Sequence, residues 1–271
     1  MSVRVFLGDI VILVLLTEKI LFQWVKGCVI VTVEISNTKQ DDEKEEQFMI
    51  REVSLEEISD GKLYGLNDLV KADCHDCKGC SACCQGMGKS IVLDPLDVHR
   101  IVQHLKRGMA ELLSGPLELS VVDGIVLPNL SMNGVGERCA FLDEAGRCSI
   151  HPYRPGICRL FPLGRYYEED SRSFRYFLQV HECRKENRTK VKVKHWIDTP
   201  DTRRYDQFIA DWHFFLKDLQ AQLADAKDEG AKEISIMVLK KFYLQPFDGS
   251  KDFYEQFYER MWEERGKIEE K

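Results

Sequence analysis

Residues 74–84 read CHDCKGCSACC, so five cysteines fall within eleven residues. Gaps of two residues between successive cysteines point the thiol side chains toward the inside of one loop, as in thiolate metal sites. The run ends in an adjacent pair, Cys83 and Cys84, and neighbouring side chains rarely reach the same ion. The pair therefore indicates either two metal centres or one ligand beside a cysteine that takes no part.

The number and spacing of the cysteines also bear on the cellular compartment. Ten cysteines in 271 residues would suit disulfides only in an oxidising compartment. Cysteines as close as these, however, would close only small and strained rings. Free thiols that bind metal in a reducing cytoplasm fit the pattern better, and we expect a cytoplasmic protein.

The composition is that of a globular protein of one or two domains, with 44% hydrophobic residues. A net charge of −7 argues against nonspecific binding of nucleic acid, and we expect no nucleic-acid partner. Residues 184–194, RKENRTKVKVK, are locally basic. We interpret them as a solvated strand edge or loop, with binding of an anionic partner as the alternative.

The N-terminal residues 5–16, VFLGDIVILVLL, resemble a short hydrophobic signal region, but Asp9 interrupts them. The apolar run is shorter than the ~20 residues of a spanning helix, and no small-residue cleavage site follows. We therefore expect residues 1–48 to be an upstream extension ending in an acidic linker, with translation starting at Met49. No stable membrane insertion is expected, and a membrane anchor is the alternative.

The part of the chain from residue 49 to residue 197 predicts short elements separated by loops. A helix at 54–58 has Ser54 as its candidate N-cap. Asp94 and Pro95 predict the start of a second helix after a short strand at 90–93. The Asp-Gly pair within residues 118–128 predicts a hairpin.

The remaining elements of this part surround the downstream cysteines. Cys139 and Cys148 enclose FLDEAGR, which predicts a small cysteine-ended knuckle with a turn at Gly146. The proline-rich residues 149–165 predict an ordered loop without regular helix or central strand. Residues 174–180 predict a strand that leads to Cys183.

After Ile197 the pattern is helical. Thr199 and Pro200 predict the start of a long helix ending at Gly230, and two further helices are expected at about 232–244 and 251–267. Their apolar stripes indicate packing surfaces: Phe208, Trp212, Phe215, Leu219 and Leu223 on the first, and Phe253, Phe257 and Met261 on the third.

We therefore predict an α+β fold in three parts. Residues 1–48 form the extension, residues 49–197 a small cysteine-rich metal-binding core with loops and short strands, and residues 198–271 an α-helical C-terminal subdomain.

Thiolates are soft ligands that select zinc, copper(I) or iron–sulfur clusters. The gaps of two, two and three residues in the set Cys74, Cys77, Cys80 and Cys84 match bacterial ferredoxins, although Gln85 stands where those motifs place proline. Zinc has no such spacing preference and accepts any four thiolates. The run predicts a metal and leaves the choice between iron and zinc open.

The segment CKGCSACC, residues 77–84, resembles the CxxCxxCC signature of the YkgJ-type cysteine-cluster proteins, which are described as zinc- or iron-chelating. Flagellin lysine N-methylases carry a related domain. The similarity continues through CAFLDEAGRCSIHPYRPGICRLFPLG, residues 139–164. The resemblance implies eight metal ligands: Cys77, Cys80, Cys83, Cys84, Cys139, Cys148, Cys158 and Cys183.

Cys74 is additional to this signature, so the ferredoxin-like spacing and the family resemblance differ on it, and we follow the resemblance for the ligand set. Around the ligands, Arg154 and Pro155 are expected to orient the loop. Arg159 either donates hydrogen bonds toward cluster sulfurs or lies on the surface. His151 is a less favoured alternative ligand.

Three functions remain. The favoured one is a metal-binding protein that holds one or two iron–sulfur clusters of the 4Fe-4S type, or zinc, through eight cysteines. The second is a protein-lysine methyltransferase related to the flagellin methylases, although no glycine-rich nucleotide motif is visible. The third is a zinc-stabilised module whose C-terminal helices bind a protein partner. Whether the protein is an enzyme stays open.

Overall fold

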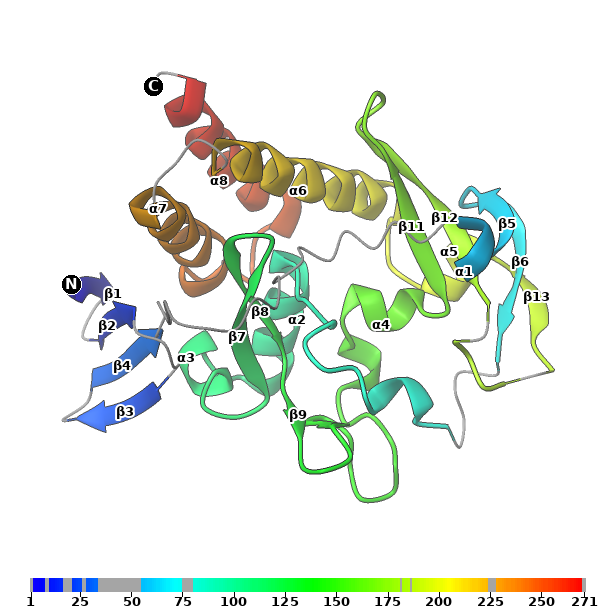
Figure 1. Cartoon of the computed structure of the whole chain (residues 1–271), viewed down its shortest axis with the longest axis horizontal. Coiled ribbons are helices and arrows are strands. Elements are labelled where there is room, and N and C mark those ends of the chain that lie inside the picture. Colours follow the sequence, from blue (N-terminus) through cyan, green and yellow to red (C-terminus); the bar gives the residue numbers. More distant parts are fainter. Residues whose placement is uncertain are drawn as a thin grey trace, which may run out of the picture.

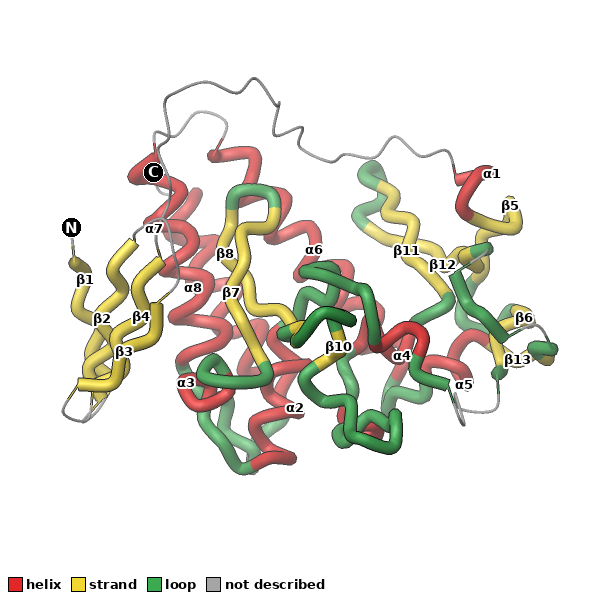
Figure 2. Tube along the Cα trace, turned by 60° about the horizontal axis from the view of Figure 1, so that its bottom comes forward, coloured by secondary structure: helices red, strands yellow, loops and turns green. Residues whose placement is uncertain are grey.

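The computed structural model describes residues 2–7, 10–16, 21–25, 28–33, 55–74, 80–180, 182–185, 187–223 and 228–269. The long C-terminal helices lie toward one end of the molecule and the sheets that contain β5, β6 and β11 to β13 lie toward the other, with the cysteine-bearing loops and α4 between them (Figures 1 and 2). Both helices and strands contribute, so the predicted α+β class is confirmed, as is the helical C-terminal region.

The N-terminal residues contain four strands, of which only the backbone is described. They form one sheet in the order β1-β2-β4-β3, with β2 and β4 parallel and the other pairs antiparallel. Their bounds are Ser2–Leu7, Ile10–Leu16, Leu21–Val25 and Cys28–Val33 for β1 to β4. The predicted linker and Met49 lie outside the described residues.

Small antiparallel sheets lie at the end of the molecule away from the C-terminal helices. One has the order β11-β12-β5 and another pairs β13 with β6. A single turn of helix, α1, precedes β5 as predicted, while its candidate cap Ser54 lies outside the described residues. The bounds are α1 Leu55–Ile58, β5 Ser59–Tyr64, β6 Leu69–Asp73, β11 Leu163–Glu168, β12 Ser173–Gln179 and β13 Thr189–Lys192.

The middle of the chain follows its local signals closely. Helix α2, Pro95–Leu105, begins at Asp94, whose carboxylate accepts a hydrogen bond from the N–H of Asp97. Strands β7, Leu117–Val122, and β8, Ile125–Leu130, form the predicted hairpin. Asp123 and Gly124 turn it with φ angles of 47° and 82°, the left-handed values that a two-residue hairpin turn needs.

Three smaller elements complete this part. They are α3, Met109–Leu112, and the paired strands β9, Met132–Asn133, and β10, Arg138–Cys139. The strand predicted at 90–93 is reduced to a bridge between Val92 and Asn129 of β8.

Long helices fill the C-terminal part, as predicted. They are α6, Thr202–Leu223, α7, Asp228–Leu239, which continues as a π-helical segment, Lys240–Leu244, and α8, Phe253–Glu269; the short α5, Val193–Ile197, precedes them. The aromatic stripes form the core: the ring of Phe208 packs edge-on against that of Phe257 at a centroid distance of 4.7 Å.

The helical part and the cysteine-rich part share one buried core. The hydroxyl of Tyr243 donates to the carbonyl oxygen of Leu93 at 2.8 Å, and the N–H of Val126 donates to Ser235 Oγ at 3.1 Å. Because these bonds are buried, breaking either one leaves an unsatisfied polar group. The helices therefore brace the segments that lead to the cysteines.

Two expectations about helices were wrong. Residues 149–165 contain a 3-10 turn, His151–Tyr153, and a short helix, α4, Gly156–Leu160. Proline obstructs a helix only in its interior, and here Pro155 stands at the N-cap. Gly230 does not end a helix but lies within α7, because a single helical glycine costs only about 1 kcal/mol.

Among the helices in the described ranges, none has the length and apolar character required to cross a bilayer.

Asp206 on α6 provides a pH-dependent link between the two parts. Its carboxylate accepts a hydrogen bond from the Tyr176 hydroxyl on β12 at 2.5 Å, and burial raises the pKa of Asp206 to about 6. Because the pKa of Asp206 is raised in the folded state, its protonation stabilises the fold at pH values below the ordinary carboxyl pKa. This contribution to the free energy of unfolding is lost as the pH rises through about 6.

We predict that Asp206→Asn, which keeps an acceptor for Tyr176, removes this pH dependence. Between pH 4 and pH 7 the free energy of unfolding of the unaltered protein should fall relative to the variant by roughly 2–3 kcal/mol. Urea unfolding of both proteins across this range measures the difference. If the free energy of unfolding changes with pH in the same way for both proteins, the pKa of Asp206 is not raised in the folded state.

Candidate metal centre

The described end of the first cysteine run is a tight turn. Ala82–Cys84 form a 3-10 helix, closed by a hydrogen bond from the N–H of Cys84 to the carbonyl oxygen of Ser81 at 3.0 Å. Cys80, Cys83 and Cys84 are all partly buried. Cys77 lies in residues 75–79, outside the described residues.

Backbone pairing brings this turn close to Cys139, one of the cysteines downstream of the first run. Gln85 forms a bridge with Arg138, and the N–H of Gly86 donates to the carbonyl oxygen of Glu137 at 3.0 Å. Cys139, at the end of β10, is thereby placed beside the turn.

The predicted knuckle between Cys139 and Cys148 is present. Leu142 pairs with Cys148, the N–H of Asp143 donates to the carbonyl oxygen of Arg147 at 2.8 Å, and Gly146 turns with φ 74°. The knuckle thus holds both of its cysteines on one small hairpin.

Cys158 is placed by α4, which is held from two sides. The N–H of Gly156 donates to the Asp97 carboxylate on α2 at 2.8 Å, and Asp97 is 2% exposed. On the other side, a Cβ at Gly156 would collide with the hydroxyl of the buried Tyr205 on α6. The position of Cys158 therefore depends on contacts with two distant helices.

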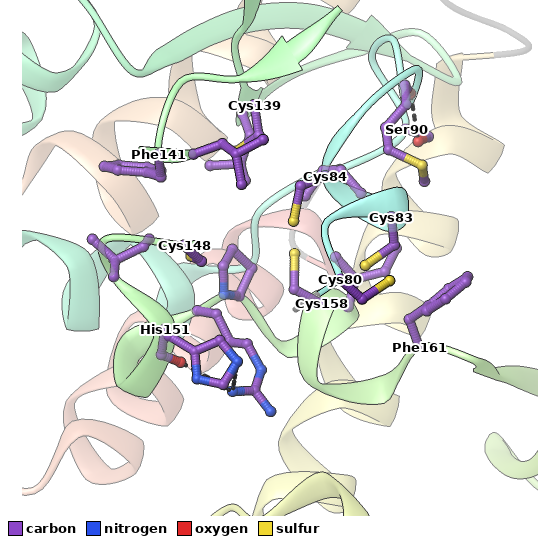
Figure 3. Close-up of a pocket in the computed structure, with 18 of the residues that line it drawn as sticks. Cys80, Cys83, Cys84, Ser90, Cys139, Phe141, Cys148, His151, Cys158 and Phe161 are labelled. Carbon is purple, nitrogen blue, oxygen red and sulfur yellow. Dashed lines mark hydrogen bonds between the residues drawn. The ribbon is translucent and has the colours of Figure 1, made fainter. Parts of the chain in front are cut away.

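These segments enclose a cavity of about 250 Å³. Figure 3 shows the Cys84 and Cys158 sulfurs facing each other, with Cys80 and Cys83 beside them and Cys139 and Cys148 across the cavity. Six of the eight predicted ligands line this one cavity: Cys80, Cys83, Cys84, Cys139, Cys148 and Cys158.

The other two predicted ligands lie elsewhere or are not described. Cys183 lines a small neighbouring cavity together with Cys74, Cys80 and Cys83, and Cys77 is outside the described residues. Cys74, Cys183 and the six cysteines of the larger cavity form no disulfides. Within the part of the chain that the structure describes, no three His, Cys, Asp or Glu side chains are already gathered closely enough to hold a metal ion.

The environment favours the protonated form of four thiols that line the larger cavity. Burial raises the pKa of Cys139, Cys148 and Cys158, while a hydrogen bond with the Cys84 thiol, followed by burial, raises that of Cys83. The positive charge of Arg154 opposes this rise at Cys83 and Cys148. A metal must displace these protons, because only thiolates bind it strongly.

Histidine and arginine side chains near the cavity have structural partners. Arg154 Nη1 lies 2.9 Å from both ring nitrogens of His151, so it donates to the nitrogen that carries the lone pair in either neutral tautomer. Arg159 is buried and donates to the carbonyl oxygens of Pro152 and Asp198. The expectation of a surface arginine is therefore wrong, since Arg159 ties the loop to the start of the helical part.

Asp97 is the site residue that sequence reasoning missed. Its capping contact with Asp94 has a local signature, an acidic residue three positions after the N-cap. Its contact with Gly156 spans 59 residues and has none.

Comparison with known proteins agrees with the cysteine pattern. Residues 76–194 match the family model CxxCxxCC, described as "Putative zinc- or iron-chelating domain". No curated protein and no solved structure matches the chain. The resemblance drawn from the motif is confirmed over these residues, and the description of the family supports zinc or iron as a partner. The donor set fits this description, since thiolates prefer zinc and iron centres.

We predict that Gly156→Ala disturbs the site through α4. The added methyl group meets Tyr205, and overpacking of this kind costs about 1–3 kcal/mol. Both the free energy of unfolding and the metal content per chain should fall. Denaturant unfolding and elemental analysis measure them.

Gly266→Ala is the matched control, because Gly266 lies in α8 and a Cβ added there would meet no other atom within 4 Å. It should leave stability unchanged or raise it slightly. Equal stability of the Gly156 variant and the unaltered protein would show that α4 is not held as described.

Proposed function

We propose that this protein holds one or two iron–sulfur clusters of the 4Fe-4S type, each bound by four thiolates, through the cysteines of its CxxCxxCC domain. The proposed ligands are Cys77, Cys80, Cys83, Cys84, Cys139, Cys148, Cys158 and Cys183. The observation that carries the proposal is the convergence of six of these thiols, from three separate segments of chain, on one cavity. Zinc is the alternative metal.

The size of the cavity favours a cluster over a lone ion. A single water requires about 10–15 Å³ of probe-occupied volume, whereas this cavity measures about 250 Å³. One ion would leave most of that volume empty. A cluster of several iron and sulfide atoms makes better use of it and can accept thiolates from opposite walls.

The walls of the cavity also suit a cluster. Apolar side chains contribute much of the lining, among them Ile91, Leu130, Phe141 and Ile150, and an apolar surround limits access of water and tunes the properties of a metal site. Arg147 and Arg154 bring positive charge near Cys148, which offsets the negative charge of thiolates. We propose a structural, electron-transferring or metal-handling role in the cytoplasm.

The direct test is purification without oxygen. A brown protein with iron and acid-labile sulfide supports the cluster. A colourless protein with zinc would replace the cluster by the zinc alternative, and a protein with neither metal would overturn the proposal.

Cys158→Ser tests whether the distant segment supplies a ligand. Serine offers a hydroxyl that is rarely ionised at neutral pH, so the centre should be lost or become labile. Because metal binding and folding are coupled, the melting temperature should also fall. Elemental analysis and thermal unfolding measure both, with Cys77→Ser expected to behave in the same way.

Cys28→Ser is the control, since Cys28 lies on β4 and outside the residues that match the family. Metal content and stability should not change in that variant. Unchanged metal content in Cys158→Ser would remove Cys158 from the ligand set.

A chain that starts at Met49 tests the proposed division into an extension, residues 1–48, a metal-binding part, 49–197, and a helical part, 198–271. We expect the shortened protein to be soluble and to carry the same metal per chain, because every cysteine of the family match is retained. Aggregation of the shortened protein, with the full chain in membranes, would instead support an anchor.

A further inference from the structure

A further cavity, of about 210 Å³, lies between the cysteine-rich part and the helical part, and none of the described cysteines lines it. Its walls come from the segment that leads into α2, from the hairpin of β7 and β8, from β11 and from one face of α6. Ile157 on α4 lines both this cavity and the metal cavity. The two cavities therefore adjoin at α4 without sharing a thiol.

Arg165, on β11, brings a positive charge to this cavity and is half-buried there. Its guanidinium donates to the hydroxyl of Tyr205 at 3.2 Å and forms a further hydrogen bond with that of Tyr167. Its Nε is buried without a hydrogen-bond partner. In the described part of the chain, no carboxylate lies at ion-pair distance from this guanidinium. Because two neutral hydroxyls do not compensate a desolvated charge, an anionic ligand would stabilise this site.

Two side chains of α6 add to the polar end of the cavity. The ring of His213 stacks on that of Tyr167 at a centroid distance of 3.5 Å, which places it next to Arg165. Burial, together with the positive charges of Lys217 and Arg165, lowers the pKa of His213 to about 4. The imidazole is therefore neutral near pH 7 and contributes one N–H donor. Lys217 is exposed at the same cavity and adds a second positive charge.

The acidic residues of the cavity are hydrogen-bonded to backbone groups or exposed to solvent. Asp94 accepts from the N–H of Asp97, and Asp97 accepts from the N–H groups of Asp94 and Gly156. Burial raises the pKa of both carboxyls, which weakens their negative charge. Asp123 is exposed on the hairpin turn, where water and salt screen its charge. These acids therefore leave Arg165 available to an anion.

Apolar side chains form much of the remaining wall: Leu127, Ile209, Trp212 and Leu216. Apolar walls with a few convergent polar groups are typical of small-molecule sites. The planar guanidinium of arginine matches a carboxylate, with which it forms two parallel hydrogen bonds. The cavity thus combines a group that recognises a carboxylate with a surface that accepts an apolar body.

We propose that this cavity is a binding site for a small monocarboxylate with an apolar body. The carboxylate pairs with Arg165 and Lys217, and the apolar body packs against Trp212. The inference goes beyond the proposed function and does not depend on it, because no described cysteine takes part.

The test is calorimetric titration of the full-length protein, purified without oxygen, with hexanoate and with benzoate. Hexanol and hexylamine are the controls for hexanoate, and benzyl alcohol is the control for benzoate, because they share the apolar bodies but carry no negative charge. Each acid should bind at least about tenfold more tightly than its controls, since charge-assisted hydrogen bonds to a carboxylate are strong. Failure of both acids to bind at about 10 mM overturns the proposal.

Variants locate the binding. Arg165→Gln should weaken the binding of hexanoate by about tenfold or more, and Lys217→Gln by a smaller factor, because an exposed charge is screened. Leu216→Trp should abolish binding by filling the cavity. Lys240→Gln is the matched control, because Lys240 is an exposed lysine of the π-helical segment that does not line the cavity, and it should leave the affinity unchanged.

The outcomes separate the two proposals. Full affinity for hexanoate in Arg165→Gln, or in Leu216→Trp, overturns the carboxylate site if the variant keeps the circular dichroism of the unaltered protein. If Arg165→Gln does not fold, Leu216→Trp and Lys217→Gln decide, because Leu216 is only partly buried and Lys217 is exposed. Absence of zinc and iron from the unaltered protein overturns the proposed function only.

Discussion

The hydrogen bond from the backbone N–H of Gly156 to the buried Asp97 carboxylate fixes the geometry of the cysteine-rich region. A buried carboxylate is costly unless it accepts hydrogen bonds, and Asp97 also accepts from the N–H of Asp94. Breaking the contact with Gly156 would leave the carboxylate undersatisfied, so α4 is held against α2. Tyr205 closes the opposite side of the same glycine. Cys158 therefore reaches the cavity only when helices from both parts of the chain are packed.

This arrangement makes deprotonation of the buried thiols less favourable. The packing that brings Cys139, Cys148 and Cys158 to one cavity also buries them and raises their pKa values. The folded chain thus prepares the positions of the donors but keeps them protonated. A metal that binds the thiolates offsets this cost of deprotonation, so the free energy of metal binding adds to the free energy of folding. The nearby charge of Arg154 reduces the cost without supplying a ligand.

Sequence reasoning succeeded where the signal was local. The helix that starts at Asp94 and the hairpin at Asp123 and Gly124 each depend on a few adjacent residues, and both are present. It failed where distant contacts decide the structure. Strand β11 begins inside the proline-rich block, at Leu163, and forms by pairing with β12. The contact between Asp97 and Gly156 joins segments that no periodicity relates. The cysteine motif predicted a metal-binding domain, but motif spacing alone does not group thiols into cavities.

The adjacent pair Cys83 and Cys84 shows why the structure was needed to assign the cysteines to cavities. In sequence the pair allowed two centres or one idle cysteine. In the 3-10 turn Ala82–Cys84, successive side chains diverge by about 120° because three residues complete a turn. Cys84 consequently lines only the larger cavity, while Cys83 lines both. One short turn therefore presents thiols to two adjoining cavities. An adjacent pair is the most compact way for a chain to do so, because both side chains leave the backbone within a single turn.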